Sequence, residues 1–135
     1  MRKRFIVLSI LTASLLFVQL NHTIKTRDDK PPVIRTKATM EEKKANKIMA
    51  MRYAKAGWGW DLRQRQCVYK LFTQESRFDH LAKNQQGSSA FGIAQMLKEK
   101  STDPAIQILN AYRYIEHRYG TPCRAWSHHV SRNWY

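Results

Sequence analysis

Hydrophobic and polar positions along this chain recur mostly at the spacing of an α-helix. Between residues 61 and 78, one predicted helix has an apolar stripe at positions i, i+3 and i+4 that ends, at i+7, in a carboxylate. The stripe consists of Val68, Leu71, Phe72 and Glu75. Because no run alternates apolar and polar residues over the length of a strand, we predict a mostly α fold, a small domain of about five helices with little or no sheet.

A separate helix is predicted at residues 39–56. Thr39 and Glu42 form the Thr-x-x-Glu pattern of a capping box, and Gly57 follows as a stop signal. The apolar face between these ends is modest. The pattern therefore leaves open whether this helix packs on the domain or projects from it.

The C-terminal part of the chain predicts three further features. Asp103 and Pro104 are typical of an N-cap and a first helical residue, and the clean apolar face that follows them ends at Gly120. Residues 88–96, with a glycine and several small side chains, indicate a turn that leads into a short helix. A last short helix is expected around Ala125.

Residues 1–20 have the pattern of a membrane-directing segment. Three cations precede a run of fourteen uncharged residues, from Phe5 to Val18, as in a secretory signal. A small-residue cleavage site is missing, so an uncleaved signal-anchor is an equal alternative. We expect a flexible basic linker at 21–38, the helix at 39–56 and a domain at 57–135. The protein would then be extracytoplasmic, either secreted, periplasmic or held on a membrane by its N-terminal segment.

The positive charge of the chain is concentrated in its N-terminal part. The 135 residues include 24 Lys and Arg against 10 Asp and Glu, a net charge of +14. Residues 1–57 carry 13 of these cations and 4 of the acids, so the domain at 58–135 retains only +5. This balance predicts an anionic partner: nucleic acid, lipid headgroups or an acidic wall polymer. An export signal does not favour nucleic acid, and the length excludes multi-domain enzymes and multi-span transporters.

Cys67 and Cys123 are the only cysteines. Two cysteines in an exported chain fit one disulfide in an oxidising compartment. Two free buried thiols are the alternative.

Glu75 is the candidate catalytic group. It follows apolar residues near the end of its helix, and Phe78 comes soon after it. Partial burial of a carboxyl raises its pKa, and a carboxyl that is protonated near neutral pH can donate a proton to a glycosidic oxygen. The alternative is a surface Glu paired with Arg77 or with another of the many cations.

The residues after Glu75 resemble the catalytic pattern of the lytic transglycosylases, which belong to the lysozyme-like superfamily. In that pattern a Glu-Ser pair, here Glu75 and Ser76, ends a helix, and an aromatic-Gly-x-x-Gln turn follows, here Phe91 to Gln95. The chain is most similar to short secreted domains of the actinobacterial and aggregation-promoting-factor type, over about residues 57–135. The other shared stretches are Gly57-Trp58-Gly59, the segment from Tyr114 to His128, and Asn133-Trp134-Tyr135.

This resemblance implies a lysozyme-like fold and a role for each matching residue. Glu75 would be the catalytic acid and base, and Cys67 and Cys123 would form the disulfide that these domains share. The residues implied to bind the substrate are Ser76, Gln95 and Tyr114, with Phe91, Trp126 and His128 as weaker candidates. The chain departs from the family at Phe91, where most relatives have Tyr, around Trp126 and His128, and in a shortened stretch from 95 to 103.

The implied reaction is non-hydrolytic cleavage of peptidoglycan. Glu75 would protonate the oxygen between MurNAc and GlcNAc and then take the proton of the C6 hydroxyl, which leaves a 1,6-anhydro end. Asp79, the only nearby second acid, is interpreted as a turn residue. No cofactor is required, and the adjacent His128 and His129 lack zinc-site spacing. The alternatives are a hydrolytic muramidase and a catalytically idle, basic, membrane-anchored structural or binding protein that keeps the fold, for example in a virion.

Overall fold

Four helices and one small hairpin make up the part of the chain that the computed structural model describes, residues 34–135. The helices are α2 (Met40–Ala56), α3 (Leu62–Ser76), α4 (Pro104–Tyr119) and α5 (Pro122–Arg132), and the hairpin pairs β1 (Ala90–Phe91) with β2 (Met96–Leu97). The mostly α fold class is confirmed. The predicted membrane-directing segment and most of the predicted linker lie outside the described residues. Within residues 34–135, no helix has both the length and the hydropathy to cross a membrane.

The helix boundaries follow the caps expected from the sequence. At the start of α2, the Thr39 hydroxyl accepts a hydrogen bond from the Glu42 amide, and the Glu42 carboxylate accepts one from the Thr39 amide at 2.7 Å. The Thr39 amide and the Arg35 guanidinium together lower the pKa of Glu42 to about 2. Asp103 caps α4 by accepting a hydrogen bond from the Ala105 amide at 2.8 Å.

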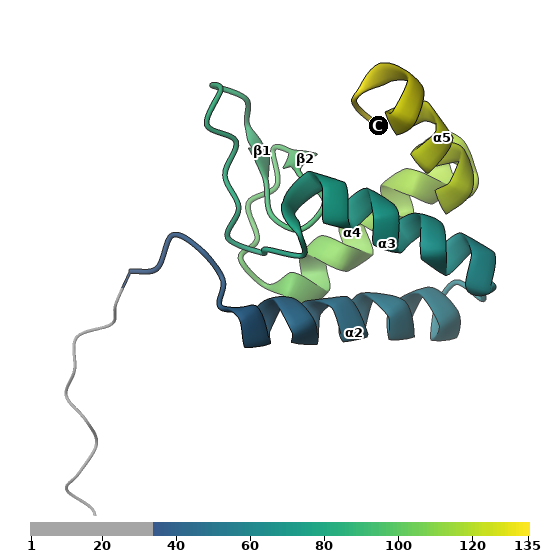
Figure 1. Ribbon diagram of the computed structural model, residues 1–135, viewed down its shortest axis with the longest axis horizontal. Helices are drawn as coiled ribbons and strands as arrows, with labels where there is room; N and C mark the ends of the chain where they lie inside the picture. Colours follow the sequence, from purple (N-terminus) through teal and green to yellow (C-terminus); the bar gives the residue numbers. More distant parts are fainter. Residues whose placement is uncertain (1–33) are drawn as a thin grey trace, which may run out of the picture. The chain divides into compact units, whose positions relative to one another are not determined.

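Helix α2 packs on the domain, which answers the question that its weak apolar face left open. Its buried apolar positions, Ala50 and Ala54, are small, so α2 approaches α3 and α4 closely. Its third buried residue, Asn46, donates a hydrogen bond to the Phe78 carbonyl at 2.9 Å. The hydroxyl of the buried Tyr112 on α4 donates to the Ala50 carbonyl at 2.7 Å. In Figure 1, α2 lies along one side of this unit, and the hairpin and α5 lie on the side away from it.

A disulfide joins Cys67 on α3 to Cys123 at the start of α5. The prediction of a single disulfide is therefore confirmed. The bridge fastens α5 to the helix that carries Glu75, and α3 and α5 pack against each other along their lengths.

The turn expected within residues 88–96 is present, but the short helix expected after it is not. The segment instead forms an antiparallel hairpin in which Ala90 pairs with Leu97. Gly92 has φ +79°, and Gln95 has φ +47°, which breaks the helical conformation in the middle of the segment. The side chain of Gln107, buried on α4, holds this turn by accepting a hydrogen bond from the Ile93 amide at 2.9 Å.

Asp79 is buried and has a structural role, as its interpretation as a turn residue predicted. Its carboxylate accepts hydrogen bonds from the amides of Leu81 (2.9 Å) and Ala38 (3.0 Å), and it lies 3.2 Å from the Lys43 ammonium. Ala38 belongs to the segment expected to be a flexible linker. The last residues before α2 are therefore held on the domain through Asp79 and through the ion pair of Arg35 with Glu42.

Candidate active site

Glu75 lies in the last turn of α3, where the backbone stops being helical. Arg77 and Phe78 have φ of +56° and +62°, and their amides donate back to the carbonyls of Thr73 and Phe72. Such a left-handed C-cap satisfies the last carbonyls of the helix and reverses the chain. The carboxyl of Glu75 is left at the edge of a cleft, while Arg77 is exposed and makes no ion pair with it within the described residues.

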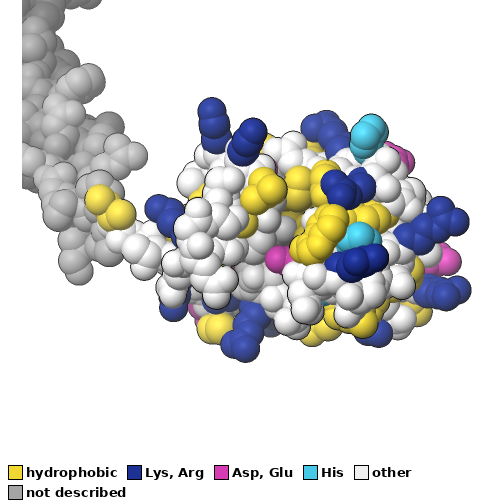
Figure 2. All heavy atoms as spheres, turned by 90° about the horizontal axis from the view of Figure 1, so that it is seen from above, with side chains coloured by type: hydrophobic (Ala, Val, Ile, Leu, Met, Phe, Trp, Pro, Cys, Tyr) yellow, Lys and Arg dark blue, Asp and Glu magenta, His cyan; other side chains and the backbone are white. Residues whose placement is uncertain are grey.

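The cleft has a volume of about 430 Å³ and lies between the end of α3, the hairpin and the C-terminal residues. Its lining combines amide, hydroxyl and apolar side chains: Glu75, Asn84, Ser88, Ala90, Gln95, Leu97, Asn133, Trp134 and Tyr135. Of these described residues, Glu75 is the only acid. Figure 2 looks onto this side of the domain, where hydrophobic side chains gather beside an acidic one and a histidine.

Burial raises the pKa of Glu75 to about 7. The side chain is 16% exposed, so its carboxylate form loses much of its hydration without a full hydrogen-bonding replacement. Near neutral pH the carboxyl is therefore protonated about half of the time, which suits a group that must both donate and accept a proton.

His129, on α5, is the basic residue nearest to Glu75. Its Nδ1 lies 3.2 Å from Oε1 of Glu75, but the two atoms are not aligned as a hydrogen bond. Burial and the neighbouring His128 lower the pKa of His129, which favours the neutral imidazole beside Glu75. Trp126 stacks on the imidazole with 5.7 Å between ring centroids.

Tyr135 forms the inner wall of the cleft. Its hydroxyl donates to the Ala94 carbonyl at 2.7 Å, and burial together with the Glu75 charge raises its pKa well above the usual value. Its ring packs against Tyr114 and Tyr119. Next to it, Trp134 borders the cleft and is 48% exposed.

Two of the residues expected to bind substrate support the backbone around Glu75. Gln95 lines the cleft, and its amide nitrogen donates to the carbonyls of Gly92 and Ala82 across the hairpin turn. The hydroxyl of Ser76 donates to the Ile93 carbonyl at 2.6 Å and so fastens the end of α3 to that turn. Ser76 is not part of the cleft lining.

The other four expected substrate-binding residues are not part of the cleft lining. Tyr114 packs edge-on against Tyr135, and Trp126 stacks on His129. His128 packs against Trp134 with 4.4 Å between centroids. Phe91 is half-buried in β1, paired with Met96. Tyr114 and His128 therefore support residues that line the cleft, whereas the partners of Trp126 and Phe91 do not line it.

Sequence reasoning missed His129 and the role of Tyr135, and it considered Trp134 only as one of four tryptophans that could stack on a sugar ring or fill the core. His129 was considered only as half of a histidine pair without zinc spacing. Trp134 and Tyr135 belong to the closing Asn-Trp-Tyr stretch of the resemblance, and that stretch was the signal that could have drawn attention to them. Among residues 34–135, no group of three or more His, Cys, Asp and Glu side chains is arranged to hold a metal ion.

No protein-family model matches the chain, and neither a curated protein nor a solved structure does. The chemistry of the site must therefore be argued from its own geometry.

Proposed function

We propose that this chain is a lytic transglycosylase that cleaves the glycan strands of peptidoglycan, with Glu75 as the single acid and base. One observation carries the proposal: a lone, partly buried carboxyl with a pKa of about 7 stands at the edge of an open cleft lined by polar and aromatic side chains. The Glu-Ser and aromatic-Gly-x-x-Gln motifs of the sequence converge on the same place.

The reaction needs two proton transfers by Glu75. The protonated carboxyl donates its proton to the oxygen that links C1 of MurNAc to C4 of GlcNAc, the C1–O bond breaks, and GlcNAc leaves with a free 4-hydroxyl. The carboxylate then removes the proton of the MurNAc C6 hydroxyl while O6 bonds to C1. The product is a 1,6-anhydro-MurNAc end, and Glu75 is protonated again.

The absence of a second acid from the described cleft lining favours this reaction over hydrolysis. Glycosidases that retain or invert the anomeric centre generally use two carboxyl groups about 5–10 Å apart on either side of the bond. Asp79 is not available for that role, because its carboxylate is buried and engaged with Lys43 and with the amides of Ala38 and Leu81.

The lining suits a glycan. Amide and hydroxyl side chains, such as those of Asn84, Ser88 and Asn133, can hydrogen-bond sugar hydroxyl and N-acetyl groups. The half-exposed ring of Trp134 offers an apolar face for a pyranose ring. The disulfide fits an oxidising, extracytoplasmic compartment, which is where peptidoglycan lies.

The test compares the full chain with Glu75→Gln on purified peptidoglycan, with the released fragments weighed by mass spectrometry. Glu41→Gln, which removes an exposed carboxylate from the first turn of α2, is the matched control. Anhydro-muropeptides from the wild type and from Glu41→Gln, but not from Glu75→Gln, support the proposal. Reducing-end products would instead identify a muramidase, and no release by any of the three proteins would favour the idle structural or binding protein.

A further inference from the structure

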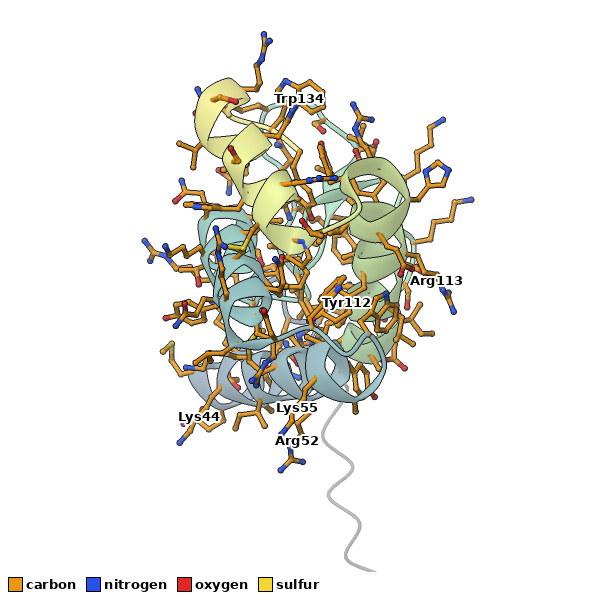
Figure 3. The ribbon with its side chains drawn as sticks, turned by 90° about the vertical axis from the view of Figure 1, so that its right-hand side faces the viewer. Lys44, Arg52, Lys55, Tyr112, Arg113 and Trp134 are labelled. Carbon is orange, nitrogen blue, oxygen red and sulfur yellow. A yellow bond between two sulfur atoms is a disulfide. The ribbon has the colours of Figure 1, made fainter. Side chains whose placement is uncertain are left out.

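A second surface feature lies on the side of α2 and α3 away from the cleft. Two neighbouring hollows of about 500 and 600 Å³ share Lys47 and Tyr69, and together they form one shallow groove, which we call the α2–α3 face. Figure 3 shows Lys44, Arg52 and Lys55 projecting from α2 at one end of the domain, while Trp134, beside the cleft, lies at the other end.

Helical spacing makes this face continuous. On α3 its members recur every four residues, at Arg65, Tyr69 and Thr73, and Arg77 follows as the C-cap residue of the helix. On α2 they run from Met40 to Lys55, a distance of about 22 Å at the rise of an α-helix.

The face is strongly cationic. Its seven Lys and Arg side chains face a single acid, Glu41, and they are Lys43, Lys44, Lys47, Arg52, Lys55, Arg65 and Arg77. Of these seven, only Lys43 has an acidic partner among residues 34–135, namely Asp79. Such a concentration of cations favours an anionic ligand.

Exposed apolar side chains stand between these cations. Met40 is 75% exposed, and Ile48 and Tyr69 are each 44% exposed, while Lys47 lies over the ring of Tyr69. A hydrophilic polyanion gains little from aliphatic side chains. A bilayer surface uses both kinds of group, since apolar side chains enter the interface while Lys and Arg bind anionic headgroups.

We propose that the α2–α3 face binds an anionic lipid surface, with α2 lying along the headgroups. Bound in this way, the domain holds its cleft on the side away from the bilayer, open to a polymer substrate. The proposal uses no property of Glu75, so it stands or falls independently of the proposed catalytic activity.

The test is a lysine footprint of the full chain on vesicles. Residues 5–18 are uncharged and mostly apolar and can hold the chain on any bilayer, so binding alone does not identify the face that makes contact. The chain is acetylated under limiting conditions, free or with vesicles of phosphatidylcholine or of an equal mixture with phosphatidylglycerol. Mass spectrometry then gives the acetylation rate at each lysine.

We expect the anionic vesicles to slow acetylation of Lys44, Lys47 and Lys55 at least fivefold, with little change at the exposed Lys83 and Lys100 on other loops. Neutral vesicles should leave all five unchanged. The proposal is overturned if the anionic vesicles slow acetylation equally at the lysines of the face and at the two control lysines, or slow it at none of them. Equal protection by a soluble polyanion, poly-dT, also overturns it, because it would assign the face to a polymer and not to lipid.

A charge-reversed pair provides the second measurement. Each cation near an anionic bilayer increases the binding affinity about fivefold. The dependence on phosphatidylglycerol is the ratio of the affinity for the mixed vesicles to that for the neutral vesicles, and Lys44→Glu with Lys55→Glu should reduce this ratio at least 25-fold. The control, Lys83→Glu with Lys100→Glu, changes the net charge equally and should keep most of that dependence. Equal losses in the two variants would mean that only the net charge matters, and would contradict a specific face.

Discussion

The Oε1 atom of Glu75 lies 3.2 Å from Nδ1 of His129, across the packing interface of α3 and α5. Burial raises the pKa of the carboxyl to about 7 and lowers that of the imidazole, so burial shifts both groups toward their uncharged forms. An environment that disfavours charge is suited to a carboxyl that must start the reaction protonated.

The first prediction concerns the pH dependence of cleavage. Because Glu75 must be protonated to begin, kcat/KM should fall about tenfold per pH unit above its pKa of about 7. His129→Ala should admit water beside the carboxyl, lower that pKa and move the alkaline limb to lower pH. A shift of one unit would reduce activity at pH 7 about fivefold.

The control for this profile is His117→Ala, which removes an exposed histidine from α4. It should leave the alkaline limb in place. If His129→Ala also leaves it in place while lowering activity at every pH, then His129 holds the carboxyl in position without influencing its titration.

The second prediction concerns stability. The pKa of Glu75 rises from 4.5 to about 7 on folding, so the folded state holds its proton more tightly than the unfolded state. The ionisation of Glu75 therefore costs the wild type no stability below about pH 4.5. As the pH rises toward 7, the free energy of unfolding decreases. The size of the pKa shift limits this decrease in the free energy of unfolding to about 3 kcal/mol. Solvent access through the open cleft reduces the expected decrease to about 1–2 kcal/mol.

Glu75→Gln has no proton to lose, so it should be more stable than the wild type at pH 8 and nearly equal to it at pH 4.5. Thermal unfolding at the two pH values measures the difference. Glu41→Gln, at an exposed position, should show no such gain at pH 8. A Glu75→Gln variant that is no more stable at pH 8 would mean that the carboxyl is better solvated than its burial indicates.

The third prediction tests the turn that supports the site. Gly92 has φ +79°, and a Cβ there would collide with the side chain of Gln107, which holds the Ile93 amide. Gly92→Ala should therefore reduce the free energy of unfolding by about 3 kcal/mol or more, through both backbone strain and overpacking. Because Gln95 and Ser76 also bond to this turn, activity should fall in the variant even where it remains folded.

Gly87→Ala separates the two causes. Gly87 has φ +81°, almost the same as Gly92, but a Cβ there would meet no atom within 4 Å. It should lose only about 1–2 kcal/mol from the left-handed backbone. Equal losses in the two variants, measured by urea unfolding, would show that the close approach of Gln107 has no energetic consequence.

The features that the sequence predicted well depend on neighbours within one helical turn. The capping pair of Thr39 and Glu42 and the Asp103-Pro104 start are such features, because their hydrogen bonds join residues two or three positions apart. The hairpin escaped prediction because its turn is held by Gln107, a polar residue from another helix that is buried at 2% exposure.

The residues of the candidate site can likewise be separated into those that neighbours in sequence predict and those that only the tertiary packing brings together. Glu75 could be found because an acid at the end of an apolar stripe is unusual, and its neighbours in sequence also bury it. His129 and Tyr135 come from the far end of the chain, and only the packing of α5 on α3 brings them to Glu75. A pattern of spacings carries no information on which residues of two distant helices will meet.

The last prediction concerns the disulfide, which links the helix of Glu75 to the helix of His129. Cys67 and Cys123 are separated by 56 residues, and a bridge closing a loop of that length contributes about 4 kcal/mol in the chain-entropy model. Cys67→Ser with Cys123→Ser should therefore unfold at a markedly lower temperature than the oxidised wild type. Reduction of the wild type with dithiothreitol should lower its unfolding temperature similarly and should leave the double variant unchanged.

Loosening α5 should also affect the site, because the 3.2 Å contact of His129 with Glu75 depends on how α5 packs on α3. At a temperature where the double variant is still folded, the alkaline limb of its pH profile should move to lower pH, in the same direction as in His129→Ala. An unchanged limb with reduced stability would mean that the helix packing alone positions His129 and that the bridge contributes only to the free energy of unfolding.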